Sequence, residues 1–312
     1  MSNPHSPNAE SRGLLYGFIG VACFSLTLPA TRTAVAELDP TIVGLGRALV
    51  AAVPAGLLLL ATRQQPPPRK YWRSLLVVVA GVIVGFPLLS ALALGQLPAA
   101  HGAIVTGLLP LSGAIAGALR AGDRPSRAFW LASLLGSGVV VVFAFLSGGG
   151  APQVADLLLL VAVAAAGMGY AEGARLARVL GAWQVICWAL LIAAPLLVVP
   201  VALAAWQHGL SASPPAWLGF AYVSLISQFL GFFAWYHGLA IGGVARVGQL
   251  QLFQPFMTIA ASALLLGESI TPLTLTAAVL VFAAVALGRR AAVARSVPAD
   301  VVLAGQPLRI KD

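Results

Sequence analysis

The sequence predicts an all-α integral membrane protein with ten transmembrane helices, arranged as two inverted repeats of five. Three observations lead there. The chain is 60% hydrophobic and only 9% charged, with a mean hydropathy of +0.95, whereas soluble domains are about a quarter charged. Apolar stretches long enough to cross a bilayer recur along the chain. A short motif also occurs twice at a fixed offset, which indicates a duplicated unit.

The apolar stretches divide the chain into spans, because about 20 apolar residues cross the hydrocarbon core of a bilayer. Proline and glycine mark most junctions, as in Pro66-Pro67-Pro68 and Gly148-Gly149-Gly150. The ten expected spans are 13–34, 41–62, 73–94, 98–119, 127–147, 154–175, 181–205, 215–238, 244–266 and 272–289. They give a tail at 1–12, a first repeat at 13–147, a second repeat at 154–290 and a tail at 291–312.

The distribution of basic residues predicts the orientation. If both termini are cytoplasmic, sixteen of the eighteen basic residues fall on the inside, and the exceptions are Arg32 and Arg47. The opposite loops hold Glu37, Asp39, Asp156 and Glu268 and no lysine. This is the positive-inside pattern. It accounts for the net charge of +9 without a nucleic-acid partner, which we do not expect.

The repeated motif has a proline followed twelve residues later by glycine and an acid. It reads Pro110 to Gly122-Asp123 in the first half and Pro255 to Gly267-Glu268 in the second, an offset of 145 residues. Other identities at that offset are Leu94 with Leu239, Ala100 with Ala245, Ala116 with Ala261, Ala118 with Ala263, and Leu119 with Leu264. Five spans per half place the two copies on opposite sides of the membrane, an architecture common in secondary transporters.

The motif and the five-plus-five plan resemble the EamA family of the drug/metabolite transporter superfamily over residues 13–290. The first copy departs from the family, because Asp123 stands where glutamate is more common. The resemblance implies that spans one to four and six to nine surround a central cavity, with five and ten at the periphery. It also implies an exporter of amino acids, other metabolites or drugs. Arg47 matches an arginine that the family commonly has in its second span.

Arg47 is the first candidate for the substrate pathway, because an ionised group at membrane depth is costly and marks function by default. It can pair with a substrate carboxylate. In the structural alternative it pairs with Glu37 or Asp39 or caps free carbonyls. Arg32 lies nearer the surface, where snorkelling or a pair with Glu37 is expected.

Amide and aromatic side chains give the second group of pathway candidates. Gln249, Gln251 and Gln254 precede Pro255 in span nine, and Gln228 lies in span eight. Amides beside a helix-breaking proline suit a polar cargo, with interhelical hydrogen bonding as the alternative. Two aromatic residues complete the group, Tyr170 and Trp183, although aromatic residues near span ends also form interfacial belts.

Three titratable residues are candidates for proton coupling: Glu172, His101 and His237. Each can titrate if burial shifts its pKa. The alternatives are an ion pair of Glu172 with Arg175 three residues later, and ordinary hydrogen-bonded histidines. Pro110 and Pro255 are the best hinge candidates, because proline breaks helical hydrogen bonding.

Function follows from the architecture. We expect a secondary transporter, an exporter of a small amino-acid-like, zwitterionic or carboxylate metabolite, with an exporter of drugs as the alternative. An integral membrane enzyme would need a catalytic constellation, and a scaffold or receptor would need larger loops; the sequence offers neither. No metal spacing or nucleotide-binding motif occurs, so no cofactor is expected. The expected partners are the bilayer and the substrate, a homodimer is left open, and the expected location is a bacterial inner membrane, a source that the sixteen arginines against two lysines favour.

Overall fold

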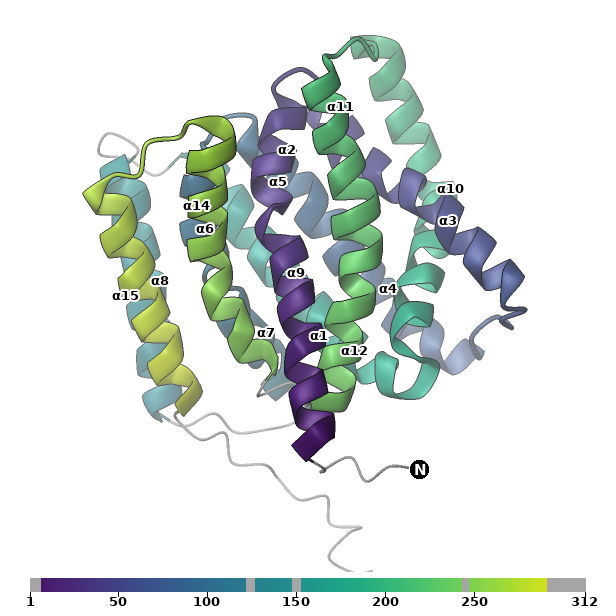
Figure 1. Cartoon of the computed structure of the whole chain (residues 1–312), viewed down its shortest axis with the longest axis horizontal. Coiled ribbons are helices and arrows are strands. Elements are labelled where there is room, and N and C mark those ends of the chain that lie inside the picture. Colours follow the sequence, from purple (N-terminus) through teal and green to yellow (C-terminus); the bar gives the residue numbers. More distant parts are fainter. Residues whose placement is uncertain (1–6, 122–126, 148–152, 243–246, 291–312) are drawn as a thin grey trace, which may run out of the picture.

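The computed structural model describes residues 7–121, 127–147, 153–242 and 247–290, which form a bundle of helices without a strand in those ranges (Figure 1). The first half contains α1 (Pro7–Ser25), α2 (Thr27–Val35), η1 (Ile42–Gly46), α3 (Arg47–Ala61), η2 (Arg69–Tyr71), α4 (Trp72–Val78), η3 (Val79–Gly85), α5 (Phe86–Leu94), α6 (Ala99–Thr106), α7 (Leu109–Ala121) and α8 (Arg127–Ser147). The second contains α9 (Val154–Leu180), α10 (Ala182–His208), α11 (Pro214–Ala221), η4 (Tyr222–Leu230), α12 (Gly231–Gly242), η5 (Gly248–Phe253), α14 (Gln254–Leu266) and α15 (Pro272–Arg290).

Seven continuous helical stretches in the described part of the chain are long and apolar enough to cross a membrane. They are Ser11–Val35, Ile42–Ala61, Arg69–Leu94, Ala99–Gly117, Val154–Leu180, Ala182–His208 and Pro214–Gly242. Three shorter apolar helices, Leu134–Ser147, Leu250–Leu266 and Pro272–Leu287, lie where the sequence predicts spans five, nine and ten. The structure is therefore all-helical with at least seven membrane-capable segments, and the count of ten spans stays a prediction.

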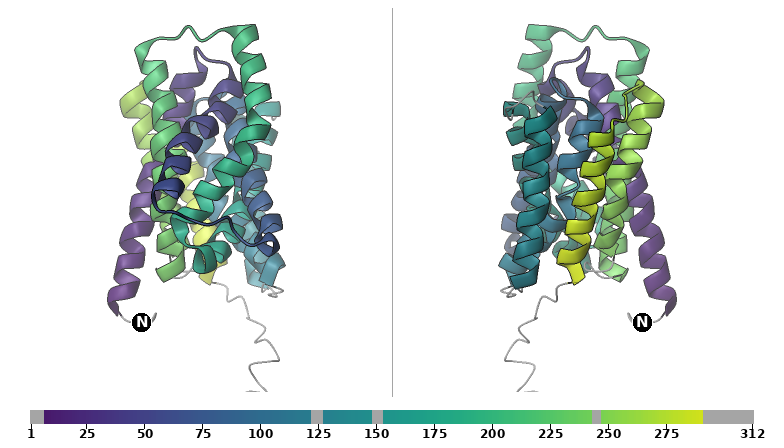
Figure 2. Two further views of the ribbon diagram at one scale, coloured as in Figure 1. Left: turned by 90° about the vertical axis from the view of Figure 1, so that its right-hand side faces the viewer. Right: turned by 90° about the vertical axis from the view of Figure 1, so that its left-hand side faces the viewer.

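The bundle has a centre and two edges. α8 and α15 pack against each other at one edge, and α3 and α10 pack at the opposite one (Figure 1). Between them α1 packs along α12, and α9 packs along α4, η3 and α5. The first turn of α1 and the last described turn of α15 lie at the same end of the bundle, opposite the loop that joins α10 to α11 (Figure 2).

Small residues allow the central helices to approach closely. A methyl group at Gly13 would overlap the backbone of Gly242, and one at Gly17 would overlap Val247. A methyl group at Gly81 would overlap the backbone of α9. Such close contacts are how helices associate in lipid, where no hydrophobic force draws them together. Gly113 meets no atom within 4 Å at a Cβ position, so its small size is not used for packing.

Several spans are interrupted where a proline lies in the first turn of a new helix. Pro29 is the third residue of α2, and the second residues of α5, α7 and α14 are Pro87, Pro110 and Pro255. Proline lacks an N–H and fits the first turn, where that group has no helical partner. The two repeat-related prolines therefore lie beside breaks in the helix, at Gly107–Leu108 and at the short helix η5.

Two of the interruptions are wide π-helical turns at repeat-related positions. Shifting η3 by 145 residues places it on 224–230, inside η4. Glycine lies at the end of each wide turn, because a methyl group at Gly85 would lie 2.5 Å from the carbonyl oxygen of Ala80, and one at Gly231 would lie 3.0 Å from that of Ile226. Wide turns of this kind are rare and are frequently found at functional sites.

Candidate functional site

A central cavity lies between the two repeats. Its lining comes from α1, α2, α3, η3 and α5 of the first half and from α9, η4, α12 and α14 of the second. The lining residues are Phe24, Thr27, Leu28, Arg47, Val82, Phe86, Ala166, Tyr170, Ser227, Gln228, Phe232 and Gln254. The cavity is narrow, with little more free space than one water molecule occupies. A metabolite therefore needs the lining helices to separate before it can bind.

Arg47 is the only ionisable side chain with a permanent charge among the lining residues. It is the first residue of α3, directly after the wide turn η1, and it is 2% exposed. Its Nη2 donates to Ser227 Oγ at 3.2 Å. Its Nε and Nη1 are buried and have no hydrogen-bond partner among the described residues. A buried guanidinium with so few partners is costly, so Arg47 is the candidate in this lining for binding an anionic group.

Arg47 forms no ion pair with Glu37 or Asp39 among the described residues, since both carboxylates accept hydrogen bonds from other groups. Glu37 accepts hydrogen bonds from the hydroxyl and backbone N–H of Ser213, each at 2.6 Å, and they lower the pKa of this loop carboxyl. Asp39 accepts from the backbone N–H of Thr41 at 2.7 Å. Arg32 likewise does not pair with Glu37, because its Nη1 donates to the carbonyl oxygen of Leu94.

One hydroxyl group contacts Arg47 and a second contacts that hydroxyl, and the sequence analysis identified neither. Ser227 of η4 is 2% exposed, and its Oγ lies 2.8 Å from Thr27 Oγ1 as well as 3.2 Å from Arg47. These three residues come from spans one, two and eight. Isolated hydroxyl residues in apolar helices carry no distinctive pattern, so only the contact identifies them.

Only some of the amide candidates line the cavity. Gln228 and Gln254 line the cavity, and the Oε1 of each is buried without a partner among the described residues. Gln228 Nε2 donates to the carbonyl oxygen of Val82 at 3.1 Å. Gln251 is 4% exposed but does not line the cavity, and the side chain of Gln249 lies outside the described part of the structure.

Aromatic rings form one wall of the cavity. Tyr170 stacks on Phe24 with centroids 6.4 Å apart, and both lie near Phe232, at 6.0 and 5.0 Å. Trp235 packs behind them, 5.9 Å from Tyr170. Trp183 lies elsewhere, against Phe233, and does not line the cavity. Of the two predicted aromatic residues, only Tyr170 is therefore placed to touch a bound molecule.

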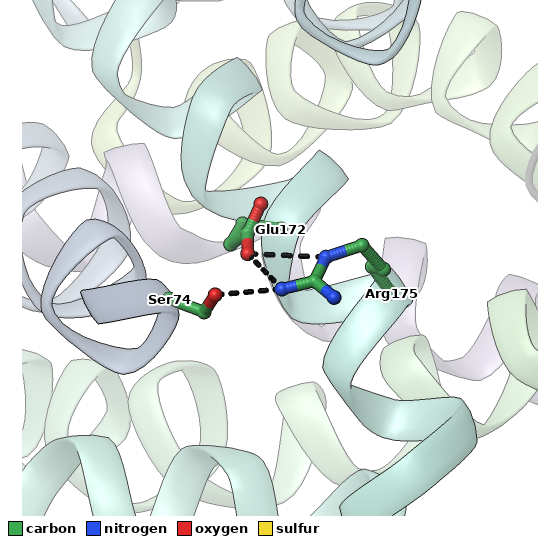
Figure 3. Close-up of polar contacts among 3 residues, drawn as sticks. All are labelled: Ser74, Glu172 and Arg175. Atoms are coloured by element: carbon green, nitrogen blue, oxygen red, sulfur yellow. Dashed lines mark hydrogen bonds and ion pairs between the residues drawn. The ribbon is translucent and has the colours of Figure 1, made fainter. Parts of the chain in front are cut away.

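Glu172 lies two residues beyond Tyr170, outside the cavity. Figure 3 shows its carboxylate facing Arg175, whose Nε and Nη2 both donate to Glu172 Oε1, the first at 3.1 Å. The same Nη2 donates to Ser74 Oγ at 2.6 Å. Glu172 is 1% exposed, whereas the Arg175 side chain is 48% exposed. This is the ion pair that the sequence offers as the alternative to proton coupling.

The histidine candidates lie at opposite ends of the bundle. His101, in the first turn of α6, places Nε2 2.6 Å from Asp156 Oδ1, and both residues are buried. Asp156 also accepts from the backbone N–H of Gln153 at 2.8 Å and so caps α9. His237 packs edge-on against Tyr16, with centroids 4.7 Å apart. The structure brings neither histidine to the cavity lining, and their part in proton coupling stays a prediction.

The second copy of the repeated motif joins the two halves. Gly267 ends α14 with φ +66°, a left-handed conformation that glycine adopts without strain. This turn directs the Glu268 carboxylate at the start of α6, where it accepts from the backbone N–H groups of Ala99 and Ala100, each at 2.8 Å. A carboxylate is favourable at a helix N-terminus. The first copy, Gly122-Asp123, lies outside the described residues.

The described residues contain no group of three histidine, cysteine or acidic side chains close enough to hold a metal ion. What they bring together is a buried cation, oriented hydroxyls, amide oxygens and aromatic faces. Such a set can bind a polar molecule reversibly.

Comparison with known proteins identifies the family. The model of the EamA-like transporter family matches the chain twice, over residues 11–145 and 153–288. The chain belongs to this family. It is also 46% identical to a protein of Bacillus subtilis (strain 168) named "Uncharacterized transporter YdeK", over 91% of this chain and 99% of that protein. A solved structure titled "Crystal structure of protein" shares the fold, with a TM-score of 0.61, 18% identity, and coverage of 89% of this chain and 96% of the other.

Membership in the EamA family, together with the named relative, makes the chain a multi-pass membrane transporter. The two matched segments also agree with the internal duplication that the offset of 145 residues predicts.

Proposed function

We propose that this EamA transporter is a secondary exporter of a small carboxylate-bearing or zwitterionic metabolite, working by alternating access in a bacterial inner membrane. In this proposal ten spans cross the bilayer and both termini face the cytoplasm. The observation that carries it is the buried guanidinium of Arg47, which lines the cavity with Nε and Nη1 free of partners among the described residues.

The chemistry of Arg47 favours a carboxylate cargo. A guanidinium presents donors in a planar fork that matches the two oxygens of a carboxylate. Bound cargo would fill the two free donor positions and neutralise the charge, so the binding free energy includes relief of an unfavourable buried cation. The lining residues include no aspartate or glutamate. A permanent organic cation would therefore meet a like charge and no counter-ion, which argues against a cationic-drug exporter.

The narrow cavity supports alternating access. Cargo of metabolite size needs the helices to move apart, and the contacts at the outer end would have to open on one side only. Glu268 links the end of α14 to the start of α6, so it joins the second repeat to the first at that end. The breaks beside Pro110 and Pro255 give each repeat a place to bend.

A flux assay in proteoliposomes tests the proposal. Purified protein is reconstituted, and uptake of amino acids, other carboxylates, their amides and quaternary ammonium dyes is measured with and without a pH gradient. Protein-free vesicles give the leak. We expect saturable flux of carboxylate-bearing compounds, and cells that express the chain should retain less of them. Flux of the ammonium dyes, unaffected by substitution of Arg47, would overturn the cargo assignment.

A further inference from the structure

The wide turns η3 and η4 both contribute to the cavity lining and are joined by one hydrogen bond. Val82 of η3 and Gln228 of η4 both line the cavity, and Gln228 Nε2 donates to the backbone carbonyl oxygen of Val82 at 3.1 Å. These residues are 146 positions apart and belong to repeat-related spans. The contact lies in the middle of the bundle, where the two repeats meet.

This hydrogen bond fixes the orientation of the Gln228 amide. A carbonyl oxygen can only accept, so the amide nitrogen must face Val82 and the amide oxygen must face away. Gln228 is fully buried, and its Oε1 has no partner among the described residues. An amide that served only to join two helices would leave no such buried acceptor, because an unpaired polar atom in the interior is unfavourable.

We propose that Gln228 determines specificity, with its Oε1 accepting a hydrogen bond from an N–H group of the cargo. The site then selects carboxylates that also carry an ammonium or another N–H donor over carboxylates that carry none. This inference rests on the proposed function and sharpens it. Arg47 offers only donors and Gln228 Oε1 only an acceptor, so the two together are complementary to a molecule that holds both kinds of group.

The rest of the lining suits the same class of cargo. Gln254 Oε1 is a second buried acceptor without a partner among the described residues. The rings of Phe24, Tyr170 and Phe232 line the same cavity, and the face of an aromatic ring attracts an ammonium group. In such a cargo the ammonium charge is balanced by the cargo's own carboxylate, so amide oxygens and ring faces can receive it although the lining has no carboxylate.

The test uses pairs of carboxylates that differ only in an ammonium group, such as glutamate with glutarate and aspartate with succinate, because these ions cross protein-free vesicles slowly. Initial rates are measured in proteoliposomes for the wild-type chain and for Gln228→Met, which keeps a side chain of similar length but replaces the amide with a thioether, a much weaker acceptor. Gln184→Met is the matched control, because Gln184 Oε1 is also buried without a described partner but lies outside the cavity.

We expect the wild-type chain to transport the ammonium-bearing member of a pair about ten times faster. In Gln228→Met that rate should fall by about tenfold, the factor that a hydrogen bond of about 1.5 kcal/mol to a charged group supplies, so the preference is lost. The rate for the other member should change by less than about threefold, which also shows that the variant is folded. Gln184→Met should keep the wild-type preference.

Two results would overturn the inference. One is a wild-type chain that transports both members of every pair equally well, and the other is a Gln228→Met variant that loses both rates in equal proportion. If the wild-type chain transports no member of any pair, the proposed function itself is wrong and the inference falls with it.

Discussion

Arg47 and Arg175 are both paired with neighbouring spans, yet their surroundings differ in a way that separates binding from structure. Arg175 donates from two nitrogens to Glu172 and from one of them to Ser74, and about half of its side chain is exposed (Figure 3). Arg47 is buried and donates to one neutral hydroxyl. The paired charge of Arg175 is explained by its protein partners, whereas the buried and incompletely paired charge of Arg47 supports the hypothesis of a ligand-binding role.

The largest effect is expected from Arg47→Met. Transport should fall about a hundredfold, since hydrogen bonds to a charged group are worth about 1.5–3 kcal/mol each. The unfolding temperature should stay the same or rise, because methionine removes a buried charge. Transport is measured as initial rates in proteoliposomes, and the unfolding temperature is measured in detergent. Arg32→Met is the control, because Arg32 donates to a backbone carbonyl; an equal loss of transport there would break the comparison.

Arg175→Met should lower the stability of the protein and leave transport nearly unchanged, the reverse of Arg47→Met. The variant removes the hydrogen bonds to Glu172 and Ser74 and should lower the free energy of unfolding by about 1–2 kcal/mol, less than for a fully buried pair because the arginine is half exposed. Transport should remain within about twofold of wild type. A variant that unfolds normally but no longer responds to a pH gradient would instead assign Glu172 to proton coupling.

Glu268→Gln tests the contribution of the Glu268 hydrogen bonds to stability, where we expect an effect of intermediate magnitude. The neutral amide keeps one acceptor oxygen where the carboxylate has two for Ala99 and Ala100. It also loses the favourable charge at the helix N-terminus, so we expect a loss of about 1 kcal/mol in stability. Glu37→Gln makes the same change at an exposed carboxylate that also accepts two hydrogen bonds, from Ser213, and so compares the two contacts. Stability equal to wild type in Glu268→Gln would mean that this contact does not hold the two repeats together.

The smallest effect is expected from Pro110→Ala and Pro255→Ala. If the breaks beside them act as hinges, transport should slow about three- to fivefold while the protein stays folded. Stability should change by less than about 1 kcal/mol, because each proline lies in a first helical turn that alanine also tolerates. Full transport by both single variants would remove the hinge hypothesis.

The sequence predicted the elements that local pattern controls. Apolar length predicted helices, and Pro110 and Pro255 were expected to interrupt them, as the breaks beside both prolines show. Arg47 was identified because charge is rare at membrane depth. The family model confirms the resemblance that the duplicated motif carried.

Long-range partners could not be predicted in the same way. Ser227 meets Thr27 at a separation of 200 residues and Arg47 at 180, and no local pattern reports such contacts. The acceptor for Gln228 is a backbone carbonyl, which every residue has. The sequences of the wide turns η3 and η4 predict ordinary α-helix, because their composition does not differ from that of α-helices. Trp183 and Gln251 were placed on the pathway by residue type alone, and the packing directs both elsewhere.

The central claim is that Arg47 binds the carboxylate of the cargo, and Arg47→Lys tests it most directly. Lysine keeps the positive charge but cannot reproduce the planar fork. Initial rates are compared in proteoliposomes for a transported carboxylate and its matched amide, in wild type and variant. We predict a loss for the carboxylate at least about tenfold greater than the loss for the amide. Equal losses for the two compounds would show that Arg47 is structural and would contradict the account.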